Sequence, residues 1–330
     1  MSVDVHNHVM PTEALDLLRR EPSYGVDLVG DEWVGVHHIP FTVVASFYDP
    51  AAKLAQLDEK GMDAAVISCP PPMYFYEVDT DDGVQLCEAA NEGMEAFCRA
   101  QPDRLRWLAN LPMQTPDSAV AAYRTAVEHG CVGAAVGASI AGRRLDEPEY
   151  EEFWSVVEEL GRPVLVHPAF NEFYAALEPY YLQNVIGIPL ETTVMVERMM
   201  CAGVLSRHPG VRLILLHGGG FVPYQVWRLA HASGVRPEIS IDADEVRRAF
   251  GQLYFDTITH DVEALQYLAA RVGIDHVMLG TDLPYDMATP TPMETLREAF
   301  DGAALQKVCC DNAAKVFDLQ GLRASDPQSA

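Results

Sequence analysis

Five side chains that can bind a metal ion or move a proton stand along this chain, two of them in an H-x-H pair and three directly after short apolar runs. They are His6, His8, His167, His217 and Asp282. Imidazole nitrogens and a carboxylate oxygen suit Zn²⁺, and Mn²⁺ or Fe²⁺ accepts the same ligands. Each side chain alone could equally be a buried polar group satisfied by hydrogen bonds. Taken together, the five placements favour a common metal site. In particular, the H-x-H pair has the i, i+2 spacing that turns two side chains of a strand to the same face.

The apolar runs alternate with amphipathic segments from end to end of the chain. Strands are predicted at residues 3–8, 64–69, 105–110, 132–136, 164–167, 212–217, 253–257 and 276–282. Helices are predicted at residues 50–60, 81–99, 117–129, 147–160, 191–205, 261–271 and 293–300. This alternation predicts an α/β fold, and the count of strands favours a (β/α)8 TIM-type barrel over an open doubly wound sheet. The five polar residues end predicted strands, so they should share the catalytic face of the barrel.

Two segments interrupt the alternation and are candidate pocket walls. Residues 21–47 are interpreted as a small strand-and-turn insertion after the first strand, and its pair His37-His38 is expected to be exposed. Residues 168–189 are rich in aromatic side chains, Phe170 among them. Long loops after barrel strands often line active sites, although packing on the barrel rim is an alternative. Residues 1–330 are expected to form one barrel domain.

The composition argues against several classes of protein. A formal net charge of −25 disfavours nucleic acid or an anionic membrane as a partner, because phosphate binding requires clustered Lys and Arg. The seven cysteines are scattered without a C-x-x-C pair, which is typical of reduced thiols in the cytoplasm. We expect no signal sequence and no membrane span, because no apolar run reaches about 18 residues. A cytoplasmic protein that acts on a small molecule is predicted.

The order of the motifs resembles the amidohydrolase superfamily. H-x-H stands in the first predicted strand, His-Pro after the fifth, H-G-G-G after the sixth and G-T-D after the eighth. Residues 48–50, 111–114, 189–193, 255–257 and 312–314 are similar to the branch of 2-amino-3-carboxymuconate-6-semialdehyde decarboxylase. That branch also contains decarboxylases of hydroxylated benzoates and some hydratases. The resemblance runs from residue 3 to about residue 317.

The resemblance implies a role for each motif residue. One divalent metal, Zn²⁺ with Mn²⁺ or Fe²⁺ as alternatives, would be bound by His6, His8, His167 and Asp282. His217 would be the general acid/base, with Asp282 beside it as a second catalytic residue. One metal rather than two is expected, because the fourth predicted strand ends at Gly137 without a lysine.

The resemblance also implies substrate contacts. Arg228 would bind a substrate carboxylate across a homodimer interface, although a solvated helix arginine is the alternative. His260, Phe170 and Tyr285 are expected to line the pocket, and His260 is equally suited to hold a loop. Residues 43–50 contain no Arg where that decarboxylase carries a second one, and Ala169 replaces its Trp. A monocarboxylate, or an uncharged aromatic or lactone-like compound, should therefore fit better than a dicarboxylate.

These features favour non-oxidative decarboxylation of a small aromatic or muconate-type acid. A hydrolase or hydratase of a small cyclic or unsaturated substrate would use the same five residues and is the alternative. An α/β serine hydrolase is disfavoured, because the segment 137–141 lacks the final glycine of a nucleophile elbow and precedes H-G-G-G. A non-catalytic barrel would be signalled by a missing metal ligand, and all four are present.

Overall fold

Eight parallel strands form the central sheet in the computed structural model, which describes residues 1–20, 26–29, 32–35, 41–169 and 174–323. In order they are β1 (Val3–His8), β5 (Ala64–Ser68), β6 (Leu105–Asn110), β7 (Gly133–Gly137), β8 (Val164–His167), β9 (Leu213–Leu215), β10 (Leu253–Asp256) and β11 (Val277–Met278). The sheet closes on itself, because the Val5 and His8 amides donate to the carbonyls of Leu279 and Leu283, each at 2.8 Å. The predicted TIM-type barrel is confirmed.

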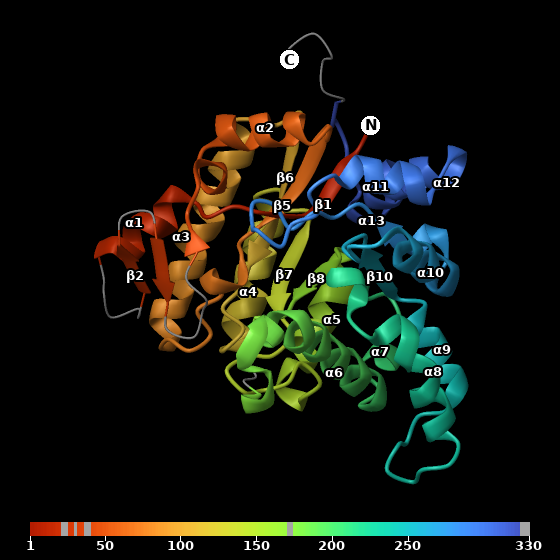
Figure 1. The fold of residues 1–330 in the computed structure, drawn as a ribbon. Coiled ribbons are helices and arrows are strands. Elements are labelled where there is room, and N and C mark those ends of the chain that lie inside the picture. The colour runs from red at the N-terminus through yellow and green to blue at the C-terminus, as the bar shows by residue number, and fades with distance from the viewer. Residues whose placement is uncertain (21–25, 30–31, 36–40, 170–173, 324–330) are drawn as a thin grey trace.

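Helices lie around the strands (Figure 1). They are α1 (Thr12–Arg20), α2 (Pro50–Glu59), α3 (Thr80–Arg99), α4 (Pro116–Glu128), α5 (Glu151–Leu160), α6 (Ile188–Cys201), α7 (Val204–Arg207), α8 (Val222–Ser233), α9 (Ala243–Phe250), α10 (Val262–Val272), α11 (Pro292–Ala299), α12 (Gly302–Gln306) and α13 (Asn312–Phe317). Several begin at a polar cap, as α2 does where the Asp49 carboxylate accepts a backbone N–H and Pro50 follows. Within the described ranges, no helix is both long and apolar enough to cross a membrane.

The predicted insertion after the first strand is a three-stranded antiparallel sheet. Its strands are β2 (Val26–Val29), β3 (Glu32–Gly35) and β4 (Phe41–Thr42), and the sheet follows α1, beside which β2 is drawn in Figure 1. His37 and His38 lie outside the described residues. Phe41, in the last strand of the insertion, lines the cavity described below. The insertion therefore contributes a wall of the site.

Successive side chains of the strands point to opposite faces and so belong to two different buried apolar clusters. Val164 and Val166 of β8 belong to the larger cluster, together with side chains of the surrounding helices. Leu165 belongs to the smaller cluster, with Ile214 of β9 and Met278 of β11. Because Leu165 and His167 share one face of β8, the smaller cluster marks the interior of the barrel, whose carboxyl end holds the site.

Two predicted strands are shorter than expected. The apolar runs before His217 and Asp282 predict that both residues end strands, whereas β9 ends at Leu215 and β11 at Met278. Both residues have positive φ, 55° for His217 and 68° for Asp282, and extended strands do not contain such residues. The two side chains therefore come from turns that follow their strands, although they still reach the same end of the barrel.

Candidate active site

The four proposed metal ligands meet at the carboxyl end of the barrel. One ligand atom from each of His6, His8, His167 and Asp282 lies within 4.8 Å of the other three, and all four residues are buried. His6 Nε2 is 3.2 Å from His8 Nε2, and Asp282 Oδ1 is 3.0 Å from His8 Nε2. Three imidazole nitrogens and one carboxylate oxygen that converge in this way fit a divalent cation. A cation bound between the two Nε2 atoms would prevent the lone pairs of these nitrogens from repelling each other.

Each imidazole of this group is held through its other nitrogen. His6 Nδ1 lies 2.8 Å from Asp256 Oδ2, and His167 Nδ1 lies 2.7 Å from the carbonyl oxygen of Pro168. Carboxylate and carbonyl oxygens only accept hydrogen bonds, so these Nδ1 atoms carry the proton and Nε2 is left for a metal. His8 Nδ1 lies 3.4 Å from the Ser68 hydroxyl. Metal-ligating histidines are oriented by partners of this kind.

Burial and mutual contact shift the pKa values of these groups in opposite directions. Burial lowers the pKa of His8 to about 4 and holds the pKa of His167 well below its usual range. Burial of His6 is outweighed by the carboxylates of Asp282 and Asp256, which raise its pKa to about 10. Burial of Asp282 is likewise outweighed, chiefly by His6, so that its pKa lies well below its usual range. The two neutral imidazoles and the ionised carboxylate are in the protonation states that metal coordination requires, whereas His6 must release its second proton when a metal binds.

His217 approaches the same centre from the turn after β9. Its Nε2 is 3.8 Å from Asp282 Oδ2, and its ring centroid is 5.1 Å from that of His167. Its Nδ1 is buried without a hydrogen-bond partner among the described residues. The imidazole is therefore beside the metal ligands but is not one of the four that converge, which is the placement expected of a group that moves a proton.

The turn that carries His217 requires glycine at two of its positions, Gly219 and Gly220. Residues 217–220 all have positive φ, between 55° and 76°. A Cβ on Gly219 would lie 2.4 Å from Cδ1 of the Phe255 ring, and a Cβ on Gly220 would lie 2.3 Å from the carbonyl oxygen of Pro189. Left-handed backbone and close contact both exclude larger residues. The H-G-G-G motif is thus a tight support for the imidazole.

Two residues of β1, Asp4 and Asn7, belong to a buried polar network that was not predicted. The Asp4 carboxylate accepts from Asn7 Nδ2 at 2.8 Å and from the Thr281 hydroxyl at 2.6 Å. Lys53 Nζ donates to Asn7 Oδ1 at 2.6 Å and to the His8 carbonyl at 3.0 Å. Burial raises the pKa of Asp4 to about 6 and lowers the pKa of Lys53 to about 7. The only sequence signal for this network is the asparagine between the two histidines of H-x-H.

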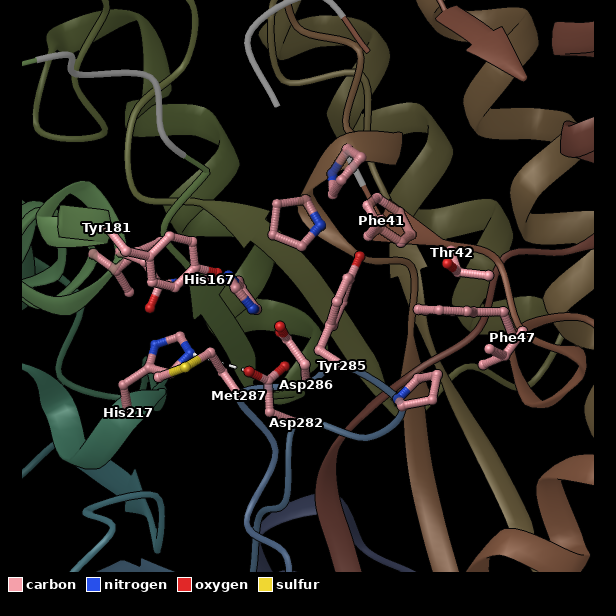
Figure 2. A pocket seen from close by; sticks show the side chains of 16 residues that line it. Phe41, Thr42, Phe47, His167, Tyr181, His217, Asp282, Tyr285, Asp286 and Met287 are labelled. Carbon is pink, nitrogen blue, oxygen red and sulfur yellow. Dashed lines mark ion pairs between the residues drawn. The ribbon is translucent and has the colours of Figure 1, made fainter. Parts of the chain in front are cut away.

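Two of the proposed metal ligands, His167 and Asp282, line a cavity of about 500 Å³. Figure 2 shows His167, His217 and Asp282 on one side, together with Tyr181, and Phe41, Phe47 and Tyr285 on the other. The Tyr285 ring packs edge-on against Phe41 and Phe47, with centroids 5.1 and 5.2 Å apart. Among the described lining residues there is no Lys or Arg, whereas Asp286 adds a carboxylate. Such a cavity suits a flat apolar ring whose anionic group faces the metal ligands.

The remaining predicted contact residues lie at different distances from this cavity. Tyr285 lines it, and Phe170 lies outside the described residues. His260 lines an adjoining cavity of about 360 Å³ that also borders His217. Arg228 is exposed on α8 and is absent from the described linings of both cavities. The structure thus brings Tyr285 and His260 to the site within one chain, but not Arg228.

The serine-hydrolase alternative finds no support in this geometry. Ser139 is fully buried, and its hydroxyl donates to Glu191 Oε1 at 3.0 Å. A nucleophile elbow instead presents its serine oxygen at the open top of the sheet.

Known proteins with similar sequences and structures agree with this site. The amidohydrolase family matches residues 3–319. The chain is 27% identical over 338 residues to 2-amino-3-carboxymuconate-6-semialdehyde decarboxylase of Dictyostelium discoideum, covering 97% of this chain and 92% of that protein. It is 29% identical over 291 residues to gamma-resorcylate decarboxylase of Rhodococcus jostii (strain RHA1), covering 81% and 87%.

The fold is shared with solved structures as well. A variant of 5-carboxyvanillate decarboxylase from Novosphingobium aromaticivorans, solved with bound manganese, matches with a TM-score of 0.83 at 21% identity and covers 97% of each chain. Because the family match spans nearly the whole chain and the buried His/Asp centre suits a divalent cation, the protein belongs to the amidohydrolase family and is a metalloenzyme.

Proposed function

We propose that this protein is a metal-dependent, non-oxidative decarboxylase of a small aromatic or muconate-type carboxylic acid. The observation that carries the proposal is the pairing of one metal-ligand cluster with an aromatic-walled cavity, with His217 at their boundary. Relatives with 27% and 29% identity over most of the chain are named as decarboxylases of such acids, which supports the same choice.

Decarboxylation breaks one carbon–carbon bond and requires one proton at the carbon that loses CO₂. The cation would be held by His6, His8, His167 and Asp282. When bound, it supplies Lewis-acid polarisation of a substrate oxygen. The aromatic walls orient the ring of the substrate and limit the access of water. His217 delivers the proton from Nε2 as CO₂ leaves, and the Asp282 carboxylate lies 3.8 Å from that nitrogen.

We propose that the acid carries one carboxylate. The described lining of the main cavity contains no Lys or Arg, and it contains Asp286, which would repel a second carboxylate. The apolar walls formed by Phe41, Phe47 and Tyr285 contact the rest of the ring. His260, at the adjoining cavity, is proposed as a further substrate contact, and Phe170 is kept as a candidate wall.

We propose Zn²⁺ as the resident ion, because three imidazoles and one carboxylate match its preferred ligands, with Mn²⁺ as the alternative. Residues 1–330 are proposed to form one barrel domain. A cytoplasmic location is proposed because all seven cysteines are free thiols, which a reducing compartment preserves.

We further propose that the enzyme is a homodimer in which Arg228 binds the substrate carboxylate of the partner's site. The side chain is exposed on α8, one turn after Tyr224, which is 72% exposed. Val185, beside the adjoining cavity, is 53% exposed and Tyr180 is 90% exposed. Large apolar side chains beside a site mouth are typical of a surface that a second subunit covers.

Mixing two inactive variants tests the shared site. In a heterodimer of His217→Asn and Arg228→Ala chains, one site keeps both an intact His217 and an arginine donated by the other chain. Turnover should therefore return to about a quarter of the parent value after random reassembly. If Arg228 serves its own chain, every site carries a defect and no activity returns. A fully active monomer in light scattering would also contradict the proposal.

The activity itself is tested by CO₂ release from a panel of acids. The zinc-loaded protein is assayed with gamma-resorcylate, 6-methylsalicylate, 5-carboxyvanillate and 2-amino-3-carboxymuconate semialdehyde, with lactones and esters alongside. Release of CO₂ from at least one acid is expected. His217→Asn should retain its metal but lose turnover by about 10²-fold or more. Hydrolysis or hydration of the neutral compounds, with no CO₂ from any acid, would instead assign the enzyme to the hydrolase alternative.

A further inference from the structure

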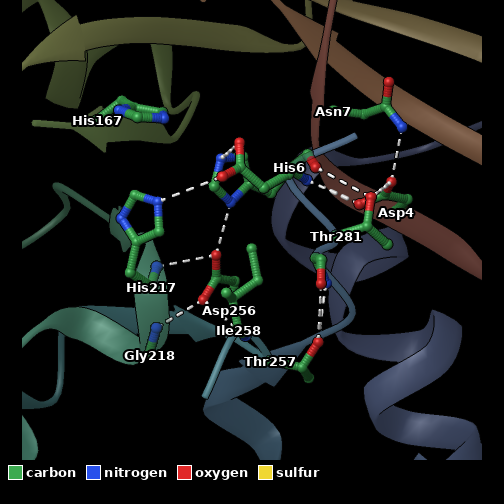
Figure 3. A network of polar contacts seen from close by, with 12 residues as sticks. Asp4, His6, Asn7, His167, His217, Gly218, Asp256, Thr257, Ile258 and Thr281 are labelled. Atoms are coloured by element: carbon green, nitrogen blue, oxygen red, sulfur yellow. Dashed lines mark hydrogen bonds and ion pairs between the residues drawn. The ribbon is translucent and has the colours of Figure 1, made fainter. Parts of the chain in front are cut away.

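The buried carboxylate of Asp256 links two parts of the site that are far apart in the sequence. It is the last residue of β10 and is fully buried. Its Oδ2 lies 2.8 Å from His6 Nδ1 and accepts from the His217 backbone N–H at 3.0 Å. Its Oδ1 accepts from the Gly218 N–H at 2.7 Å and from the Ile258 N–H at 3.2 Å. Figure 3 shows Asp256 between His6 and the turn at His217 and Gly218.

The contact with His6 determines which nitrogen of that ring can bind a metal. A carboxylate can only accept, so it holds the proton of the imidazole on Nδ1 and leaves the lone pair on Nε2. That Nε2 faces His8 Nε2 at 3.2 Å and Asp282 Oδ1 at 3.3 Å. Asp256 therefore selects the tautomer of His6 whose free nitrogen points to the centre of the ligand group.

The contacts of Asp256 with the turn fix the position of the His217 ring. Backbone N–H groups of two successive residues, both with positive φ, point to the same carboxylate. Among the described residues, no other side chain accepts a hydrogen bond from these two amides. Without the carboxylate, both amides of the turn would lose their hydrogen-bond acceptor. The His217 imidazole would then no longer be held in one position relative to the metal ligands.

We propose that Asp256 is a positioning residue that aligns the metal ligand His6 and the proton-transfer group His217 through a single carboxylate. The spacing between the metal and the proton donor would then be set by one rigid group at the end of β10. Its effect on the metal does not depend on the reaction, whereas its effect through His217 rests on the proposed function.

The substitution Asp256→Asn tests this role with little change in volume. An amide offers one acceptor oxygen and one donor NH₂, whereas four donors face the two oxygens of Asp256. With the NH₂ toward His6, the imidazole proton moves to Nε2, the ligand nitrogen. With the NH₂ toward Gly218 and Ile258, two backbone N–H groups face another donor and lose their acceptor. The affinity for Zn²⁺ alone, measured by competition with a chelator, should fall by about 10–100-fold.

A neighbouring substitution supplies the matched control. The Thr257 hydroxyl contacts Gly280 backbone atoms at 3.1 Å and no ligand ring, so Thr257→Val disturbs the same strand end without touching His6. Its zinc affinity should stay within about threefold of the parent. Unchanged zinc affinity in a folded Asp256→Asn protein would overturn the proposal, and so would an equal loss in both variants. Neither measurement requires a substrate, so this test can succeed or fail independently of the decarboxylase assignment.

Two further measurements test the link to His217. One of them uses only the parent protein, so it remains possible if Asp256→Asn fails to fold. At saturating zinc, kcat should fall in Asp256→Asn, but adding this change to His217→Asn should produce no further loss. Multiplicative losses would show that Asp256 does not act through His217. In the zinc-loaded parent, nitrogen NMR should show His6 protonated at Nδ1. Coordination through Nδ1 would contradict the proposal.

Discussion

Replacing Gly219 by alanine tests whether the glycine turn fixes the proton-transfer group. The new Cβ would meet Cδ1 and Cε1 of the buried Phe255 ring at 2.4 and 2.6 Å, at a φ of 76°. A left-handed conformation costs about 1–2 kcal/mol for a non-glycine residue, and overpacking adds about 1–3 kcal/mol. The free energy of unfolding should therefore fall by about 2–5 kcal/mol. Relief of the contact displaces the turn, and a shift of about 1 Å at His217 would reduce kcat by about 10²-fold.

The measurements are urea unfolding, zinc content and turnover, with two graded controls. Gly218→Ala has positive φ but a nearest contact of 3.2 Å, so it should incur mainly the backbone cost. Gly234→Ala has φ −86° and a nearest contact of 3.6 Å, so it should change stability by less than about 0.5 kcal/mol. If Gly219→Ala is as stable and active as Gly234→Ala, the close approach of this turn to Phe255 is not what positions His217.

Three further predictions concern other parts of the molecule. Chelation of the metal should lower Tm, because an ion at 100 times its Kd stabilises the fold by about 2.7 kcal/mol; an unchanged Tm would show that no ion is bound. Tyr285→Phe should not reduce stability, because its hydroxyl is buried without a partner among the described residues, but it should raise KM; an unchanged KM would remove the tyrosine from the substrate site. The bond from Arg207 lowers the pKa of Glu151 from 4.5 to about 2, so this pair stabilises the fold above pH 4.5 and the effect disappears as pH falls through about 2. Glu151→Gln should therefore flatten the unfolding free energy over this pH range, at a loss of about 0.5 kcal/mol at pH 7, and an unaltered acid slope would contradict this.

The parts of the fold that the sequence predicted well are those with strong local signals. β1, β6 and β8 have the predicted bounds: β6 and β8 are mainly apolar and end in a polar group, and β1 carries the H-x-H pair at its end. β9 and β11 were predicted too long, because an apolar run does not reveal that His217 and Asp282 adopt positive φ. α8, which begins two residues after H-G-G-G, was not among the predicted helices, although its buried residues Val222, Val226 and Leu229 have helical spacing.

The site shows a similar division between local and tertiary information. Among the proposed metal ligands, His6 and His8 were identified by their H-x-H spacing, and His167 and Asp282 because each follows an apolar run. Asp256 follows Leu253–Phe255 in the same way, so the same signal could have identified it. The burial of Lys53 and Asp4 could not be predicted, because a charged residue in an amphipathic helix or at a strand start is usually solvated. The proposed role of Arg228 would depend on a second chain, and no pattern within a single chain determines such a role.

The most direct test of the account is the metal content of the purified protein and of its His6→Ala, His8→Ala double variant. Both side chains belong to the four-ligand cluster. Elemental analysis should find one equivalent of zinc or manganese in the parent and none in the variant, which should remain folded by circular dichroism. Two equivalents in the parent would indicate a binuclear centre. A parent that binds no divalent metal even after supplementation would contradict the account and leave only the barrel.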